Sequence, residues 1–134
     1  MTRVMAFGTF DTLHKGHEYF LGEAAKLGDE LYVVIAKDDT VTMLKGRPPL
    51  HDEDSRRTAV QALKWVTRAT LGYEHDKYAI IEELKPDIIC LGYDQVHFID
   101  RLGPELKKRG LHPKIVRLTA FKPEIYKSSK LRKE

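Results

Sequence analysis

The chain has 134 residues, 42% of them hydrophobic and 32% charged, and its formal net charge is +3. This composition is typical of a globular protein, and the length predicts one domain over residues 1–134. Basic and acidic residues are interspersed and no apolar run approaches the roughly 18 residues of a membrane span, so we expect a small polyanionic substrate, no nucleic-acid partner and no membrane partner.

The first predicted element is a short apolar strand that leads into a turn rich in glycine and histidine. Residues 4–7 form a continuous apolar run, as a parallel strand buried on both faces requires, and helical spacing follows the turn. His14 and His17 stand where a helix N-terminus and its dipole favour an anion. Gly8 and Gly16 leave room for a phosphate to approach the backbone. The pattern therefore predicts a phosphate-binding turn at the strand end.

Residues 8–17 read G-T-F-D-T-L-H-K-G-H, which resembles the G-x-F-D-x-x-H-x-G-H signature of the nucleotidyltransferases with a Rossmann-like fold. Those enzymes transfer AMP or CMP from a nucleoside triphosphate and release pyrophosphate. The resemblance implies that His14 and His17 are catalytic and donate hydrogen bonds to the α-phosphate. It also implies nucleotide contacts from the other turn residues Thr9, Phe10, Lys15 and Gly16.

Two other interpretations of the histidines are open. The turn could be a helix-capping loop with two surface histidines. A zinc site at His14 and His17 is the second alternative, and it lacks an evident third ligand. Two glycines together with two histidines directly after a strand favour the phosphate-binding turn.

A helix is predicted over residues 17–26 and a second buried strand over residues 31–36. The segment 41–50 contains a glycine and two adjacent prolines, which predicts a loop above the same sheet edge. Lys45 and Arg47 in this loop would neutralise the charge of the triphosphate. In the resembled family a lysine near this position contacts the triphosphate, which implies a catalytic role for Lys45. A solvated basic loop is the alternative.

The next predicted helix covers residues 53–64, with Asp52 as its N-cap. Arg56 lies near the start of this helix, where the dipole disfavours a cation, so we expect a phosphate or an acidic partner beside it. The resemblance implies a phosphate contact for an arginine at this position. A surface arginine is the alternative.

The second half of the chain alternates strands with helices. Cys90, in the predicted strand 87–91, is expected to be inert core. A single cysteine also excludes an intrachain disulfide and fits a reducing compartment. Pro104 falls inside a predicted helix and is expected to kink or restart it. The predicted elements are, in chain order, strand 68–71, helix 78–84, strand 87–91, helix 99–109 and strand 114–118.

Two further segments are candidates for nucleotide binding. After strand 87–91 the chain reads L-G-Y-D-Q, which resembles another element of the same family. Asp94 would bind a ribose hydroxyl or a base amino group, and Gly92 would let the nucleotide lie against the backbone; a plain turn is the alternative. In the tail, Tyr126 offers an aromatic face, and Ser128 and Ser129 offer hydroxyl and N–H groups to a phosphate.

The tail also distinguishes two classes of acceptor. Cytidylyltransferases of the family have an R-T-E-G-I-S-T-T-like stretch, of which this chain matches only the end. A tyrosine before two serines is similar to the archaeal-type FAD synthetases, as are the segments G-D-E-L-Y-V-V-I-A-K-D-D and K-G-R-P-P. This resemblance implies adenylyl transfer from ATP to FMN, with Mg²⁺ on the triphosphate. Glycerol-3-phosphate cytidylylation from CTP is the first alternative, and a non-catalytic nucleotide-binding regulator is the second.

The predicted fold is α/β and Rossmann-like, with about five parallel strands and helices on both faces of the sheet. In such a fold the chemistry lies at the carboxyl edge of the sheet. We expect a cytoplasmic homodimer, with no signal peptide because the N-terminus runs directly into the first strand.

Overall fold

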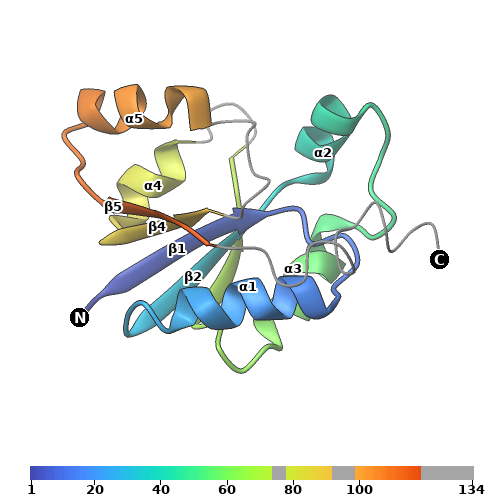
Figure 1. Ribbon diagram of the computed structural model, residues 1–134. Coiled ribbons are helices and arrows are strands. Elements are labelled where there is room, and N and C mark those ends of the chain that lie inside the picture. Colours follow the sequence, from blue (N-terminus) through green and yellow to red (C-terminus); the bar gives the residue numbers. More distant parts are fainter. Residues whose placement is uncertain (74–77, 92–98, 119–134) are drawn as a thin grey trace.

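The computed structural model describes residues 1–73, 78–91 and 99–118, which form an α/β domain around a five-stranded parallel sheet (Figure 1). The strands are ordered β3-β2-β1-β4-β5, and every neighbouring pair is parallel. The Rossmann-like prediction of about five parallel strands is therefore confirmed. The strands are β1 (Arg3–Gly8), β2 (Glu30–Ile35), β3 (Arg68–Leu71), β4 (Ile88–Leu91) and β5 (Lys114–Arg117).

Strand β1 is central, and its side chains alternate between two hydrophobic cores. Val4 and Ala6 belong to one core and Met5 to the other, and all three are fully buried. A strand covered on both faces needs this unbroken apolar sequence, because neither side of the pleat meets water. Cys90 of β4 is also fully buried, and burial raises the pKa of its thiol to about 12. This fits the expectation of an inert core cysteine.

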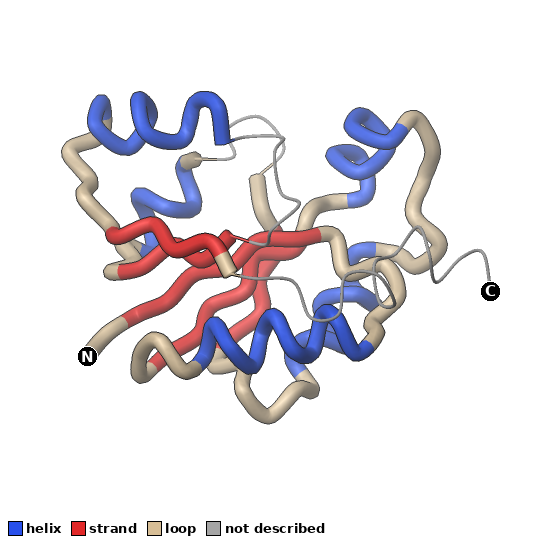
Figure 2. Tube along the Cα trace, in the orientation of Figure 1, coloured by secondary structure: helices blue, strands red, loops and turns tan. Residues whose placement is uncertain are grey.

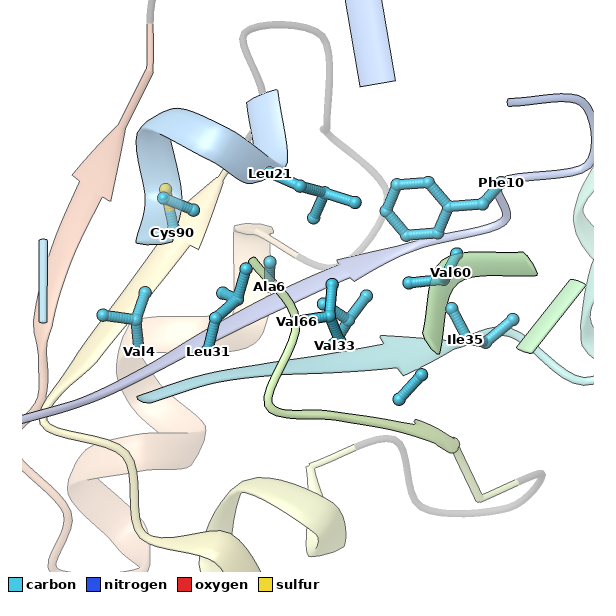
Figure 3. Close-up of a cluster of buried hydrophobic side chains, with 12 residues drawn as sticks. Val4, Ala6, Phe10, Leu21, Leu31, Val33, Ile35, Val60, Val66 and Cys90 are labelled. Atoms are coloured by element: carbon cyan, nitrogen blue, oxygen red, sulfur yellow. The ribbon is translucent and has the colours of Figure 1, made fainter. Parts of the chain in front are cut away.

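Helices cover both faces of the sheet, as predicted (Figure 2). The first core is closed by α1 (Lys15–Ala25) and α3 (Glu53–Gln61), which contribute Leu21 and Val60 (Figure 3). The second core is closed by α4 (Ala79–Leu84) and α5 (Ile99–Lys108), which contribute Ile81 and Leu102. Helix α5 continues through Pro104. Among the described helices, none is long and apolar enough to cross a membrane.

One prediction of local structure was wrong. The segment 41–50 was expected to be a loop, but helix α2 (Asp38–Lys45) occupies its first half. Two aspartates in the first turn and a lysine in the last complement the helix dipole. The helix-breaking residues Gly46, Pro48 and Pro49 all lie beyond the end of the helix, where Gly46 is the C-cap with φ 75°.

The order of the strands determines where a ligand can bind. From β1 the chain moves outward through β2 and β3, and it then returns to the other side of β1 for β4 and β5. The order thus reverses beside β1, and open α/β sheets bind ligands at the carboxyl ends of strands at such a point. The histidine turn follows β1 at this edge, and α2 follows the neighbouring strand β2 (Figure 1).

Candidate active site

The turn after β1 is built around Phe10. This residue has φ 52°, in the left-handed region, and is only 4% exposed. A Cβ at Gly8 would lie 2.5 Å from Cε2 of that ring, so only glycine fits there. The sequence predicted a glycine here to leave space for a phosphate, and the structure adds a second reason, which is space for the Phe10 ring. The Phe10 ring meets His17 edge-to-face at a centroid distance of 5.3 Å, so Gly8 supports a catalytic candidate through Phe10.

His14 is the N-cap of α1. Its backbone is extended, with φ −141° and ψ 177°, and its Nδ1 accepts a hydrogen bond of 3.0 Å from the Gly16 N–H. Because Nδ1 is the acceptor, the proton of the neutral ring is assigned to Nε2. The capping interpretation and the catalytic interpretation of His14 are therefore compatible, since one ring nitrogen caps the helix while the other carries a proton.

The two histidine rings stack against each other, with centroids 3.9 Å apart and planes inclined by 25°. Burial, together with the nearby charges of His14 and Lys45, lowers the pKa of His17 to about 4. The Thr12 backbone acts in the opposite direction, although no hydrogen bond of ordinary geometry reaches His17 Nδ1 from the described residues. Burial also lowers the pKa of His14. Both imidazoles are consequently neutral at pH 7, and each ring has one N–H group that can donate a hydrogen bond.

Lys45 is the last residue of α2, and its side chain is exposed. Its charge is close enough to His17 to lower the pKa of that ring, so the structure brings Lys45 to the histidine site. Arg47 follows Gly46 and is also exposed. Lys15, the first residue of α1, is exposed beside the turn.

The segment after α2 is attached to the histidine turn by Asp11. The Asp11 carboxylate accepts hydrogen bonds from the backbone N–H groups of Leu50, at 2.8 Å, and His51, at 2.9 Å. Burial alone would raise the pKa of Asp11, but these bonds and the His51 side chain outweigh it and keep that pKa below its usual value. The carboxylate therefore joins the turn to the chain that follows Lys45.

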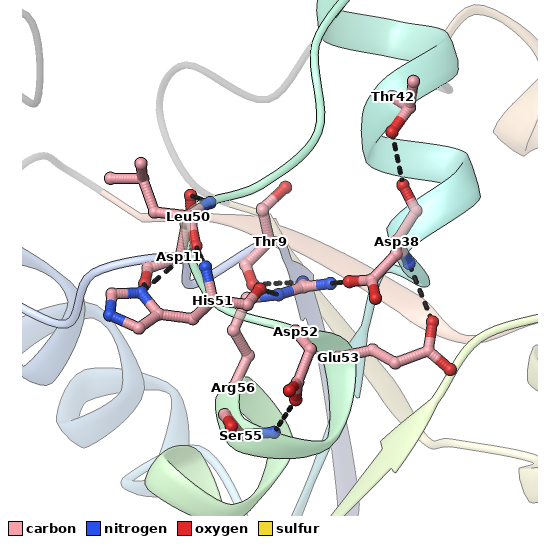
Figure 4. A network of polar contacts seen from close by, with 10 residues as sticks. All are labelled: Thr9, Asp11, Asp38, Thr42, Leu50, His51, Asp52, Glu53, Ser55 and Arg56. Atoms are coloured by element: carbon pink, nitrogen blue, oxygen red, sulfur yellow. Dashed lines mark hydrogen bonds and ion pairs between the residues drawn. The ribbon is translucent and has the colours of Figure 1, made fainter.

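The sequence predicted either a phosphate or an acidic partner beside Arg56, and the structure shows an acidic partner, Asp38. Its Nη2 donates to Asp38 Oδ1 at 2.7 Å, and the residue is only 1% exposed (Figure 4). The surface alternative for this arginine is thereby excluded. Asp52, the predicted N-cap of the same helix, accepts from the Ser55 N–H at 2.7 Å, as expected.

Several predicted residues lie outside the described part of the chain. These are Gly92, Asp94, Tyr126, Ser128 and Ser129. Asp11 and Asp38 also lie at the site, although neither was predicted from the sequence. Asp11 is a fixed position of the quoted signature, and Asp38 lies three residues after the end of β2, so their locations in the sequence were the available signals.

The described residues do not form a metal cage. Residues 1–73, 78–91 and 99–118 contain no group of three or more His, Cys, Asp or Glu side chains placed to hold a metal ion. The carboxylates of Asp11 and Asp38 are also engaged, Asp11 by backbone N–H groups and Asp38 by Arg56. This donor set fits a Mg²⁺ ion that is bound mainly by triphosphate oxygens and water.

The chain matches the family model described as cytidylyltransferase-like over residues 5–134. It belongs to the cytidylyltransferase-like family. Within this family, a FAD synthase from Aciduliprofundum boonei is 52% identical over 121 residues, which cover 90% of this chain and 80% of the relative. A FAD synthase from Thermoplasma volcanium is 46% identical over 134 residues, covering 100% of this chain and 94% of the relative. The resemblance to archaeal-type FAD synthetases is thereby confirmed.

Two solved structures share this fold. A Thermoplasma volcanium protein described as a lipopolysaccharide core biosynthesis protein superimposes with a TM-score of 0.84 at 48% identity, covering 90% of this chain and 98% of its own. An Archaeoglobus fulgidus protein described as of unknown function gives a TM-score of 0.71 at 17% identity, covering 88% of this chain and 90% of its own. At that identity the second likeness bears on the fold alone.

Proposed function

We propose that this protein transfers the AMP group of ATP to FMN, which forms FAD and releases pyrophosphate. The observation that carries the proposal is a pair of stacked, neutral histidines at the start of α1, in a chain whose FAD synthase relatives match 90–100% of its length. The histidine pair supports nucleotidyl transfer, and the relatives support FMN as the acceptor.

The reaction is an in-line displacement at the α-phosphorus. A phosphate oxygen of FMN forms a bond to this phosphorus, the bond to the bridging α–β oxygen breaks, and the electron pair leaves with pyrophosphate. The phosphate nucleophile is already ionised at pH 7, so the protein needs neither a covalent intermediate nor a strong base. Catalysis then consists of positioning the two phosphates and stabilising the charge that develops on the transferring group.

The neutral histidines suit this task. Nε2–H of His14 and the N–H of His17 would donate to the non-bridging oxygens of the α-phosphate as charge shifts in the transition state. The N-terminus of α1 would add its dipole, with contacts from Thr9, Phe10, Lys15 and Gly16. Two neutral imidazole rings can stack with their centroids 3.9 Å apart. Two imidazolium rings at this distance would repel each other strongly.

Positive charge would come from outside the histidine pair. Lys45, with Arg47 beyond it, would bind the β- and γ-phosphates and stabilise the leaving pyrophosphate. Mg²⁺, bound through phosphate oxygens, would neutralise further charge on the triphosphate. We also propose Gly92 and Asp94 for the nucleoside and Tyr126, Ser128 and Ser129 for ring and phosphate contacts, in a cytoplasmic homodimer.

A second candidate function is cytidylyl transfer from CTP to glycerol 3-phosphate. The family description, cytidylyltransferase-like, favours considering it. Both reactions can be tested together by incubating the protein with Mg²⁺ and either ATP or CTP, adding a panel of phosphorylated acceptors, and measuring pyrophosphate. Pyrophosphate that depends on ATP and FMN is the expected result. Pyrophosphate that depends only on CTP and glycerol 3-phosphate would reject FMN as the acceptor.

A further inference from the structure

Arg56 is the buried charged residue of the described chain, with 1% of its surface exposed. Burying a guanidinium is costly unless its donors are paired, because the charge loses its hydration. The proposed chemistry does not use this cation. Its side chain has no exposed surface, so a substrate phosphate could not reach it in this structure. Its role must therefore be sought in the groups that it contacts.

The three nitrogens of Arg56 bind three separate segments around the site (Figure 4). Nη1 donates to the Thr9 carbonyl at 2.9 Å, in the turn that carries the histidines. Nη2 donates to Asp38 Oδ1 at 2.7 Å, at the first residue of α2. Nε donates to the His51 carbonyl at 2.9 Å, in the segment that joins α2 to α3. One side chain of α3 thus holds the histidine turn, the start of α2 and the chain beyond α2.

Neighbouring contacts reinforce this arrangement. Glu53, at the start of α3, accepts a hydrogen bond of 2.8 Å from the Asp38 N–H, so α3 holds both the backbone and the side chain of that residue. Asp11 holds the N–H of His51 while Arg56 holds its carbonyl. Lys45 lies between these two attachment points, so its distance from the histidines depends on them.

We propose that Arg56 is a positioning residue, which fixes the lysine-bearing helix α2 relative to the histidine turn without touching the substrate. The proposal rests on the proposed function of Lys45 and the histidines. Arginine suits this position because its planar fork directs donors to several acceptors at once, whereas the single ammonium of lysine cannot reproduce that geometry. The contacts with Asp38, Thr9 and His51 form one unit.

The first arm of the test is a kinetic double-mutant cycle with Arg56→Lys, Asp38→Asn and the double variant. Each enzyme is assayed at a temperature where circular dichroism shows it folded. Each single variant should lose about tenfold or more in kcat/KM, mostly in kcat, because displaced histidines lose contacts made in the transition state. The double variant should be no worse than the poorer single variant, because both substitutions disrupt one unit.

Two kinetic outcomes would overturn the proposal. A folded Asp38→Asn variant with normal kcat/KM would show that the ion pair does not position the site, even where Arg56→Lys fails to fold. A higher KM for ATP in Arg56→Lys, with kcat kept and Asp38→Asn normal, would assign Arg56 to a phosphate instead. Arg57→Lys is the matched control on the same helix, and it should leave both parameters unchanged.

The second arm measures amide hydrogen exchange and needs no activity. In Arg56→Lys and Asp38→Asn, exchange should accelerate across residues 38–51, whereas strand β1 and the Arg57→Lys control should match the wild type. Unchanged exchange across residues 38–51 in both variants would contradict the proposal. If the wild-type protein forms no FAD but these amides respond, the proposed function fails while the positioning role of Arg56 stands.

Discussion

At the scale of single residues, protonation states determine what the histidine pair can do. His14 and His17 stack at 3.9 Å, so a proton on one ring makes a proton on the other unfavourable. Burial and the nearby Lys45 charge act in the same direction on His17. The pair is therefore suited to donating hydrogen bonds to a phosphate rather than to transferring protons at pH 7.

Replacing His17 tests the transition-state role. His17→Ala should lower kcat by roughly 100- to 1000-fold, the range found when a donor to a developing oxyanion is removed. ATP affinity should fall far less, because this contact strengthens mainly in the transition state. Steady-state kinetics and isothermal titration with ATP measure the two quantities, and circular dichroism checks the fold. A folded variant with near-normal kcat would reject the assignment.

The same ring predicts acid sensitivity of the fold. The folded pKa of His17 is about 4 and its ordinary value is 6.5, so between these values the unfolded chain binds a proton that the folded chain does not. The contribution of His17 to the free energy of unfolding should therefore be fully present above pH 6.5. It should be lost as the pH decreases toward 4, a total loss of roughly 3 kcal/mol. Urea unfolding at several pH values measures the slope. The His17→Ala variant should lose most of this pH dependence. A variant with the same slope as the wild type would show that His17 is not the buried group responsible.

The sequence alone predicted the histidine pair but not the residues that hold it in place. The glycines, the histidines and the preceding apolar run lie within a short stretch, so the local pattern was sufficient. The Arg56 contacts join residues 18 and 47 positions apart, to Asp38 and Thr9, and no local pattern reveals such pairs. The contact of Gly8 with the Phe10 ring likewise depends on a positive φ that the sequence did not indicate.

At the scale of elements, helix α2 stands where the sequence predicted a loop. Strong breakers at 46–49 dominated the prediction, while the helix-favouring residues before them were overlooked. This helix matters for the proposed role of Lys45, because Lys45 ends a helix anchored at Asp38 rather than standing in a loop. A helix restricts where the ammonium can go, and this favours contact with one part of the triphosphate.

Lys45→Ala should affect both kinetic parameters. The ammonium would meet the triphosphate in the ground state and the leaving pyrophosphate in the transition state, so KM for ATP should rise and kcat should fall, each by about tenfold. Lys26→Ala is the control, since Lys26 caps the far end of α1 and pairs with Glu23. If Lys45→Ala behaves like the control, the end of α2 does not take part in the reaction.

At the scale of the whole molecule, the strand order brings the parts of the site together. β1 leads into the histidine turn, and β2 leads into α2. The two strands are paired along their full length, from the pair Arg3–Glu30 to the pair Gly8–Ile35. The sequence predicted all five strands to within one residue. For β1, β2 and β4 the signal is an apolar run, because these strands are largely buried between two covered faces, whereas the edge strands β3 and β5 are more exposed. The strand order itself required the structure.

The central claim is that this chain joins AMP to FMN. The most direct measurement is chromatography of a reaction containing the purified protein, FMN, ATP and Mg²⁺, with a parallel reaction containing glycerol 3-phosphate and CTP. FAD should accumulate in the first reaction with an equal amount of pyrophosphate, and His17→Ala should form it far more slowly. CDP-glycerol without FAD would contradict the acceptor, and no pyrophosphate in either reaction would contradict nucleotidyl transfer.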